Sequence, residues 1–254
     1  MKEDKFYIYG RNAVIEAMNA NIPLEKVYVL YNLAGDIIQK ISYMANKKKI
    51  PIVKYDKQKF AELEKKISLE GFKSQGIIAL RSVINYFDID ELISYSFKNN
   101  KNPTLVILNE INDVHNLGAI ARSAECSGAS GIIIPERNAS PITPAAIKSS
   151  AGALSHIKVA KTGSIINTIV KLKDAGFWIA AADMNGKINY FDEKFDKPIV
   201  LIIGNEGKGV SSAVLKHCDL VLKIPMKGKI DSLNASVSAG IILFEILKQK
   251  LNLD

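Results

Sequence analysis

The sequence predicts an α/β protein whose sheet strands run mostly parallel, and three observations support this fold class. Short apolar segments alternate with helical stretches along almost all of the 254 residues, an order typical of parallel sheets covered by helices. The segment 199–203 is apolar at every position, as expected for a strand covered on both faces. Hydrophobic residues make up 48% of the chain, enough for a buried core. A β-sandwich and a helix bundle are therefore disfavoured.

The first block of alternating elements occupies the N-terminal third of the chain. Asp56 directly precedes its third helix, and we expect the Asp56 carboxylate to cap that helix. The expected strands span residues 6–9, 26–30, 50–55 and 76–80, and the expected helices span residues 11–19, 34–48 and 57–67.

A polar segment separates this block from the next. Residues 81–103 carry several aspartates and asparagines around one short helical patch, a composition typical of a linker. We therefore expect an N-terminal domain of residues 1–82, a linker of residues 83–102 and a second domain of residues 103–254.

The second block has the stronger strand pattern. Its last helix, about residues 234–249, is apolar on nearly all sides, so it should pack against a second surface besides the sheet. A partner subunit would supply that surface, although the helix could also be enclosed within one subunit. The expected strands span residues 104–108, 131–134, 157–160, 177–182, 199–203 and 220–224, with helices in the gaps.

A membrane span, an export signal and a metal site are not expected. The longest apolar run, residues 237–247, is shorter than the roughly 18–20 residues that cross a bilayer, and the N-terminus is charged rather than apolar. Cys126 and Cys218 lie far apart without a CxxC pattern, so we expect buried thiols rather than a disulfide or metal ligands. These features indicate a cytoplasmic protein.

The formal net charge of +8 indicates a polyanionic partner, because lysines and arginines that neutralise phosphates release condensed counterions. A lysine-rich solvated surface explains the same charge equally well. Charge alone therefore does not establish nucleic-acid binding.

The first of three polar segments, residues 109–124, follows the strand at 104–108. Asn116 and Arg122 lie in the helix that this segment enters, and the rest of that helix is small and apolar. A guanidinium there needs a partner, and a phosphate fits its fork and fixed charge. Half of a structural ion pair is the alternative. We interpret the lone His115 as a structural or ligand-contacting side chain rather than as a catalytic base.

The second segment, residues 202–211, leads from a strand through a glycine-rich turn. Three glycines in six residues allow the backbone to approach a ligand closely. Lys208 is followed by glycine rather than by serine or threonine, and the glycine spacing is not G-x-G-x-x-G, so a phosphate loop and a dinucleotide loop are disfavoured. Glu206 suits a ligand with positive charge or hydroxyl donors. A plain connecting turn is the alternative.

The third segment, residues 222–240, leaves a strand, crosses a polar loop and enters the last helix. Ser232 and Asn234 are residue types that cap helix N-termini. Free amides at that helix start can also bind a carboxylate or another acceptor. By itself this segment supports only helix capping.

Taken together, in this order, the three segments closely resemble the motifs of the SpoU (TrmH-like) RNA ribose methyltransferases of the SPOUT superfamily, over residues 104–250. Residues 8–17 and 75–79 resemble the small RNA-binding domain, with an L30e-like fold, of the 23S ribosomal RNA guanosine 2′-O-methyltransferase branch, and residues 149–157 fit that branch too. Val114 stands where the family commonly has proline, and Ser74 where it commonly has histidine. These departures concern the choice of nucleotide rather than the reaction.

The resemblance implies a deep trefoil knot in the C-terminal domain, a homodimer, S-adenosylmethionine as cofactor and no metal. It implies methyl transfer to the ribose 2′-hydroxyl of a 23S guanosine. The alternatives are a transfer RNA guanosine, a ribosomal uridine, or a non-catalytic RNA-binding protein of the same fold. The implied catalytic residues are Asn116, Arg122, Glu206 and Asn234; the implied cofactor-binding residues are Gly204, Asn205, Glu206, Gly207, Gly209, Ile224, Met226, Ser232, Leu233 and Asn234; the implied RNA-binding residues are Arg11, Lys73, Gln75 and Arg122.

The chemistry of such a transfer suggests roles for these side chains. A ribose hydroxyl is a poor nucleophile, and the enzyme must align donor, methyl carbon and acceptor oxygen. We expect Arg122 to contact the phosphate beside the target ribose, with Asn116 and Glu206 fixing its orientation. Arginine is too basic to be an obvious proton acceptor.

Overall fold

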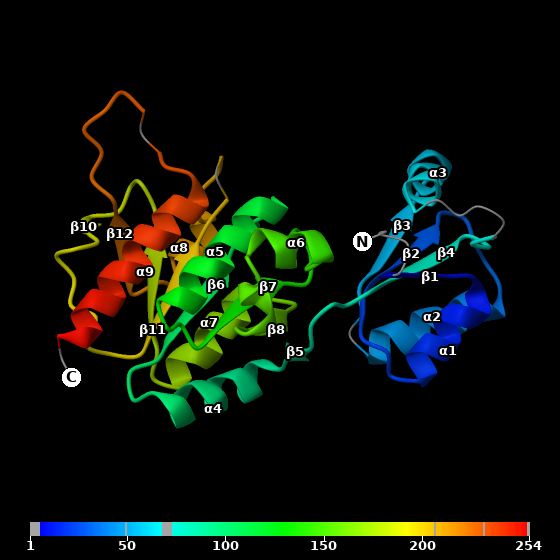
Figure 1. Cartoon of the computed structure of the whole chain (residues 1–254), viewed down its shortest axis with the longest axis horizontal. Coiled ribbons are helices and arrows are strands. Elements are labelled where there is room, and N and C mark those ends of the chain that lie inside the picture. Colours follow the sequence, from blue (N-terminus) through cyan, green and yellow to red (C-terminus); the bar gives the residue numbers. More distant parts are fainter. Residues whose placement is uncertain (1–5, 49, 68–72, 206, 231, 253–254) are drawn as a thin grey trace. The chain divides into compact units, whose positions relative to one another are not determined.

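The computed structural model describes residues 6–48, 50–67, 73–205, 207–230 and 232–252. It divides into two compact units, Met1–Asn85 and Tyr86–Asp254. Each unit has its own sheet (Figure 1). The α/β fold class is confirmed.

The first unit holds a four-stranded sheet in the order β1-β4-β2-β3. The strands β2 and β3 are parallel, whereas β4 runs antiparallel to both β1 and β2. This sheet is thus mixed rather than mostly parallel. The sequence did not predict this, because the spacing of apolar residues does not reveal the direction of a strand. The strands are β1 (Tyr7–Tyr9), β2 (Leu24–Leu30), β3 (Ile52–Tyr55) and β4 (Ile77–Arg81).

Three helices cover the two faces of this sheet. Helices α1 (Arg11–Asn19) and α2 (Asp36–Lys47) pack on one face, and α3 (Lys57–Lys66) packs on the other (Figure 1). The cap expected at α3 is confirmed, because Asp56 Oδ1 accepts a hydrogen bond of 2.8 Å from the backbone N–H of Lys59.

The second unit holds an eight-stranded sheet in the order β10-β12-β9-β11-β6-β7-β8-β5, and all its neighbouring strands are parallel. The fully apolar strand β11 lies between β6 and β9 and is buried along its length, which confirms it as a central strand. The strands are β5 (Tyr86–Phe87), β6 (Thr104–Leu108), β7 (Gly131–Pro135), β8 (Lys158–Thr162), β9 (Trp178–Ala182), β10 (Ile188–Asn189), β11 (Ile199–Ile203) and β12 (Leu220–Lys223).

Helices cover both faces of this larger sheet. Helices α4 (Ile89–Asn99), α7 (Ile165–Asp174) and α8 (Ser212–Leu215) contribute to one hydrophobic cluster with the strands. Helices α5 (Val114–Cys126), α6 (Pro144–Ser149) and α9 (Ala235–Leu251) pack together elsewhere in the unit, beside the short 3-10 helix Ala153–Ser155 (Figure 1). Small residues allow a close approach there, since a Cβ added at Gly118 would lie 2.6 Å from the Cβ of Ser149.

The expected linker at residues 83–102 is wrong for most of its length. Residues from Tyr86 onward form β5 and α4 inside the second unit. Leu92 of α4 is fully buried in the core of this unit, and the polar residues Asp88 and Glu91 form a capping box at the start of the helix. The polarity that indicated a linker therefore belongs to a helix start and to a solvent-facing side.

Helix α9 combines a buried face with exposed apolar residues. Ala239, Ile242 and Leu243 are buried, while Val237 and Phe244 are each 48% exposed. Of the helices in the described parts of the chain, none has the length and apolar character that crossing a membrane requires.

The two cysteines are free, and the expectation that both are buried is wrong for one of them. Cys126 is exposed, because it lies on the outer side of the last turn of α5. Cys218 is half-buried, and this burial raises the pKa of its thiol to about 11.

Candidate functional site

The polar segments meet because of the order of the strands in the larger sheet. Strands β12, β9, β11 and β6 are consecutive neighbours and parallel, so the loops that follow them leave from the same edge. This is the carboxyl edge, where open α/β sheets place their ligands. All three polar segments predicted from the sequence start here.

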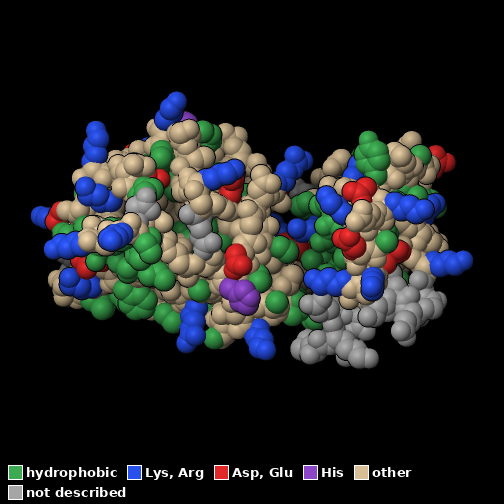
Figure 2. Space-filling view, turned by 90° about the horizontal axis from the view of Figure 1, so that it is seen from above, with side chains coloured by type: hydrophobic (Ala, Val, Ile, Leu, Met, Phe, Trp, Pro, Cys, Tyr) green, Lys and Arg blue, Asp and Glu red, His purple; other side chains and the backbone are tan. Residues whose placement is uncertain are grey.

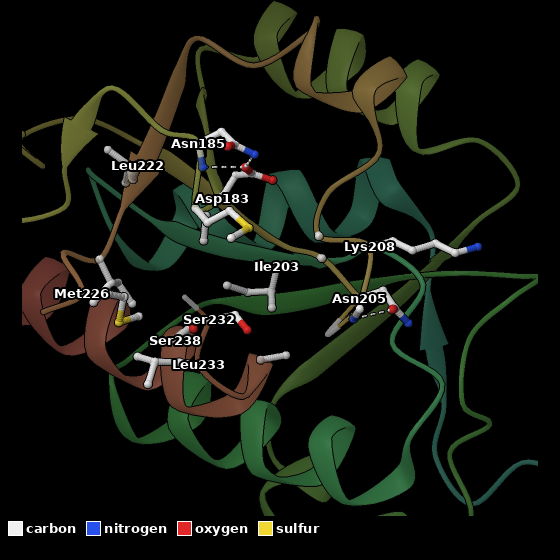
Figure 3. A pocket seen from close by; sticks show the side chains of 17 residues that line it. Asp183, Asn185, Ile203, Asn205, Lys208, Leu222, Met226, Ser232, Leu233 and Ser238 are labelled. Atoms are coloured by element: carbon white, nitrogen blue, oxygen red, sulfur yellow. Dashed lines mark hydrogen bonds between the residues drawn. The ribbon is translucent and has the colours of Figure 1, made fainter. Parts of the chain in front are cut away.

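A pocket of about 310 Å³ lies at this edge (Figure 3), near the lower end of the size range of small-molecule sites, roughly 300–1,000 Å³. Eight predicted cofactor-binding residues line it, namely Gly204, Asn205, Gly207, Gly209, Ile224, Met226, Ser232 and Leu233. Glu206 lies outside the described residues. Asn234 is not one of the described lining residues, and it has a different role.

The loop after β9 also lines the pocket, with Asp183, Met184 and Asn185, and Lys208 and Ser238 join it from the other segments. Lys208 and Ser238 lie in the polar segments predicted from the sequence, whereas Asp183, Met184 and Asn185 were not predicted. The one available signal was position, because the loop follows the predicted strand at 177–182 and so leaves the sheet at its carboxyl edge.

The glycine-rich turn after β11 requires its glycines. Asn205 and Gly209 exchange backbone hydrogen bonds of 3.1 and 2.7 Å, and Gly209 has a φ of +64°. A Cβ at Gly204 would collide with the backbone of Gly209 and Val210. At Gly204 and Gly209 the turn therefore presents backbone to the pocket, because a side chain would clash at Gly204 and would be strained by the positive φ at Gly209.

Side-chain amides tie this turn to the loop after β6. Asn205 Nδ2 donates a hydrogen bond of 3.1 Å to the carbonyl oxygen of Glu110, and Asn205 Oδ1 accepts one of 2.9 Å from the N–H of Gly207. Asn109 Oδ1 accepts a hydrogen bond of 3.2 Å from the N–H of Ser211. Glu110 has a φ of +62°, an uncommon conformation for a residue with a side chain. The Asn205 side chain thus connects the two loops.

A second amide contact joins the first and third polar segments. Asn234 Nδ2 donates a hydrogen bond of 3.0 Å to Asn116 Oδ1, although the two residues are 118 positions apart. Asn234 Oδ1 also accepts a hydrogen bond of 2.9 Å from the N–H of Ser236 and so caps α9. Two residues predicted to be functional therefore lie side by side.

Asp113 fixes the start of the helix that carries Asn116. Its carboxylate accepts hydrogen bonds of 2.9 Å from the N–H of Asn116 and 2.7 Å from the N–H of His115. These hydrogen bonds hold the pKa of Asp113 below its ordinary value, and the bond from the Asn116 N–H has the largest effect. Asn116 itself is largely buried.

Arg122 lies further along α5 and is exposed. Among the described residues the structure shows no carboxylate in an ion pair with Arg122, so its structural-pair interpretation gains no support there. The described residues that line the pocket do not include Arg122 either. The Arg122 side chain is thus exposed outside the described part of the pocket.

The predicted RNA-binding residues of the first unit also lie together. The Arg11 backbone N–H donates to Gln75 Oε1 and the Arg11 guanidinium Nε donates to the Gln75 carbonyl, both at 3.3 Å. A Cβ at Gly10 would lie 3.9 Å from the carbonyl oxygen of Lys73. Gln75 has a φ of +54°, so the segment before β4 is bent sharply toward the start of α1.

On the face of the second unit that Figure 2 shows, the described lysine and arginine side chains do not gather into one dense patch. Figure 2 views the molecule from the side toward which the loop between β12 and α9 projects in Figure 1, and lysines and arginines are spread around this face of the second unit. Among the described residues no cluster of three or more histidines, cysteines, aspartates or glutamates could hold a metal ion.

Comparison with known families gives two matches. Residues 103–244 match the model of the SpoU rRNA Methylase family, and residues 7–81 match the model for RNA 2′-O ribose methyltransferase substrate binding. The first range falls within the second unit and the second range within the first unit. Residues 82–102 belong to neither match.

Curated relatives match over nearly the whole chain. YacO of Bacillus subtilis (strain 168), assigned to the TrmH family of tRNA/rRNA methyltransferases, is 34% identical over 250 residues, which is 98% of each chain. A Staphylococcus aureus (strain MSSA476) protein with the same family assignment is 34% identical over 243 residues, 96% of each chain.

Solved structures share the fold. The SpoU methyltransferase AviRb from Streptomyces viridochromogenes matches with a TM-score of 0.61 and 23% identity over 97% of this chain and 90% of its own. The same protein in complex with AdoMet gives a TM-score of 0.60 and 22% identity, over 97% and 91%. The A. aeolicus TrmH/SpoU tRNA modifying enzyme gives a TM-score of 0.56 and 27% identity, over 65% and 83%.

Proposed function

The chain belongs to the SpoU rRNA methylase family, and from this premise we propose that it transfers a methyl group from S-adenosylmethionine to the ribose 2′-hydroxyl of a guanosine in 23S ribosomal RNA. One observation supports the proposal most strongly. Segments distant in sequence build a single pocket at the carboxyl edge of the sheet, and the amides of Asn116 and Asn234 meet beside it.

The pocket suits the proposed cofactor. Ile203, Leu222 and Leu233 supply apolar surface of the kind that a nucleobase contacts, while Ser232 and Asp183 supply polar groups for hydroxyl donors. When bound, S-adenosylmethionine supplies a methyl group activated by its sulfonium.

The residues around the pocket would prepare the acceptor. Arg122, exposed on α5, would bind the phosphate beside the target ribose and stabilise negative charge that develops on its 2′-oxygen. Asn116, held by Asn234, would orient that nucleotide. Glu206 is assigned a part in this orientation by the family resemblance alone.

The first unit would hold the surrounding RNA through Arg11 and Gln75, which are hydrogen-bonded to each other, and through Lys73, whose backbone carbonyl lies near Gly10. Sequence-specific recognition of RNA favours unpaired nucleotides in loops, so we expect the target guanosine in a loop. A transfer RNA is the second candidate substrate, because the names of the relatives include both tRNA and rRNA.

Three further features belong to this proposal. The exposed apolar residues Val237 and Phe244 on α9 suit the interface of a homodimer. We also propose, from the family resemblance alone, that the C-terminal loops are knotted and that the protein acts in the cytoplasm.

Mapping of 2′-O-methylated riboses in total RNA from cells with and without the gene tests the proposal. We expect one guanosine of 23S RNA to lose its methyl group without the gene, and to regain it when purified protein and S-adenosylmethionine are added to that RNA. Loss of a methylated ribose in transfer RNA would instead identify the second candidate. An unchanged map, with no transfer to any RNA in vitro, would contradict the reaction itself.

A further inference from the structure

The described part of the pocket contains one acidic side chain, Asp183, which follows β9. The Asp183 backbone is fixed by two hydrogen bonds of 3.0 Å. Its N–H donates one to the Leu222 carbonyl, and its carbonyl accepts the other from the N–H of Gly186. The side chain is half-buried. It is therefore a positioned carboxylate rather than a freely moving one.

Only one of its two oxygens is used within the loop. Oδ1 accepts hydrogen bonds of 2.9 Å from the Asn185 backbone N–H and 3.1 Å from Asn185 Nδ2. Figure 3 shows the other oxygen turned away from Asn185, toward the turn that carries Asn205 and Lys208. A carboxylate oxygen that faces a pocket can accept further hydrogen bonds.

The facing turn leaves room for such a bond because its nearest residue is a glycine. A Cβ at Gly209 would lie 2.9 Å from Asp183 Oδ2, close enough to cover that oxygen. The absence of a side chain thus keeps Oδ2 open to the pocket.

The arrangement has a physical parallel in other nucleotide sites. There, a glycine-rich turn follows one parallel strand, and an acidic residue after another strand of the same sheet accepts a hydrogen bond from a ribose hydroxyl. Here the glycine turn follows β11 and Asp183 follows β9, its direct neighbour.

We propose that Asp183 Oδ2 accepts a hydrogen bond from a ribose hydroxyl of the bound cofactor. The inference rests on the proposed function, since it takes S-adenosylmethionine as the ligand. In this assignment the loop after β9 recognises the nucleoside part of the cofactor and not its sulfonium charge. The demethylated product carries the same nucleoside.

Calorimetry with S-adenosylmethionine and S-adenosylhomocysteine tests this assignment. For Asp183→Ala we expect Kd to rise by about tenfold or more, because hydrogen bonds to charged groups are among the stronger ones. The factor should be the same for both ligands, since both carry the ribose. The 2′-deoxy and 3′-deoxy analogues of S-adenosylhomocysteine identify the hydroxyl that is bonded. For the analogue that lacks this hydroxyl, the Kd values of Asp183→Ala and wild type should agree within about twofold, because neither complex can form the hydrogen bond.

Three controls make the outcome interpretable. Asp192→Ala removes an exposed carboxylate outside the pocket and should leave Kd unchanged. Asp183→Asn keeps an oxygen at this position and should lose less than Asp183→Ala, and thermal unfolding of both variants establishes that they fold. Wild-type protein that binds neither ligand would count against the proposed function.

Three results with a binding-competent wild type would overturn the assignment itself. The first is an unchanged Kd in Asp183→Ala. The second is a loss for S-adenosylmethionine that greatly exceeds the loss for S-adenosylhomocysteine, which would indicate pairing with the sulfonium. The third is an undiminished loss with both deoxy analogues.

Discussion

The two ends of the eight-stranded sheet are held by different chemistry. At the amino end, charged side chains are used for structure: Lys173 Nζ lies 2.6 Å from Asp219 Oδ1, and Asp219 Oδ2 accepts a hydrogen bond from the Ile179 N–H. Lys250 Nζ donates to the carbonyl of Asn102 and, at 2.7 Å, to Thr104 Oγ1. At the carboxyl end, neutral side-chain amides link the described loops, namely those of Asn109, Asn205 and Asn234.

The difference shows how one sheet separates stability from function. Neutral amides fix the loops without forming ion pairs with nearby charges, so Lys208 and Asp183 stay available to ligands, and Arg122, further along α5, is exposed. At the amino end no ligand is expected, so charged side chains there can form ion pairs and hydrogen bonds within the protein. The predictions below test this separation, beginning with the largest effect.

Arg122→Ala should lower methyl transfer by about 10²–10³-fold, the usual cost of removing one donor that stabilises developing negative charge. Thermal stability should stay close to wild type, because the side chain is exposed. Single-turnover transfer rates and thermal unfolding measure the two effects. Lys216→Ala, an exposed cation before β12, is the control and should transfer normally; equal losses in both variants would remove the distinction between the ends.

Lys250 should make the amino end sensitive to high pH. Burial lowers the pKa of Lys250 from 10.5 to about 8, so between these values the unfolded state binds more protons and the unfolding free energy rises with pH. We expect the unfolding free energy of wild type, relative to that of Lys250→Met, to rise by about 3 kcal/mol as the pH increases across this window. Denaturant titrations at several pH values measure it.

Lys248→Met is the matched control for this prediction. Lys248 lies on the same helix but is exposed and paired with Glu245, so its substitution should give a difference that is flat with pH. If the difference in unfolding free energy between wild type and Lys250→Met were also independent of pH, the pKa of Lys250 in the folded protein would not be lowered.

Asn234→Ala should destabilise the protein by about 1–2 kcal/mol through loss of the α9 cap and should also slow methyl transfer. Asn234→Ser separates the two roles, because serine caps a helix but cannot donate the amide bond to Asn116. We expect near-normal unfolding and slow transfer in Asn234→Ser. Fast transfer in that variant would mean that the contact with Asn116 has no part in catalysis.

Asn205→Ala should have the smallest effect, a severalfold rise in the Kd of S-adenosylmethionine that corresponds to about 1 kcal/mol for the lost hydrogen bonds. Asn112→Ala is the comparison. Asn112 Nδ2 donates to the same Glu110 carbonyl but lies on the same loop, so its loss leaves the link between loops intact. Equal Kd values in the two variants would argue against a role for that link.

The elements best predicted from the sequence are those with strong local patterns. The expected bounds of α1, β6 and β11 agree with the structure, since each is a clear apolar run or a helical repeat between turn residues. Helix α4 was expected only as a short helical patch within a linker, because its capping residues resemble a polar linker. Strands β5 and β10 were missed because each has two residues.

The site was predictable only in part. Glycines and helix-capping residues identified the turn after β11 and the start of α9, because their chemistry is local. Asp183 was not identified, since its place in the pocket depends on β9 pairing with both β11 and β12, a long-range arrangement that local patterns do not encode. The same limit applies to the contact between Asn116 and Asn234.

The most direct test of the account is a crystal structure of the protein with S-adenosylhomocysteine and its RNA target. The account predicts the ligand in the pocket of β9, β11 and β12, with a nitrogen of the Arg122 guanidinium within hydrogen-bond distance, about 3 Å, of the target nucleotide's phosphate or 2′-oxygen. A structure in which every Arg122 of the assembly is separated from that ribose by protein or solvent would contradict it.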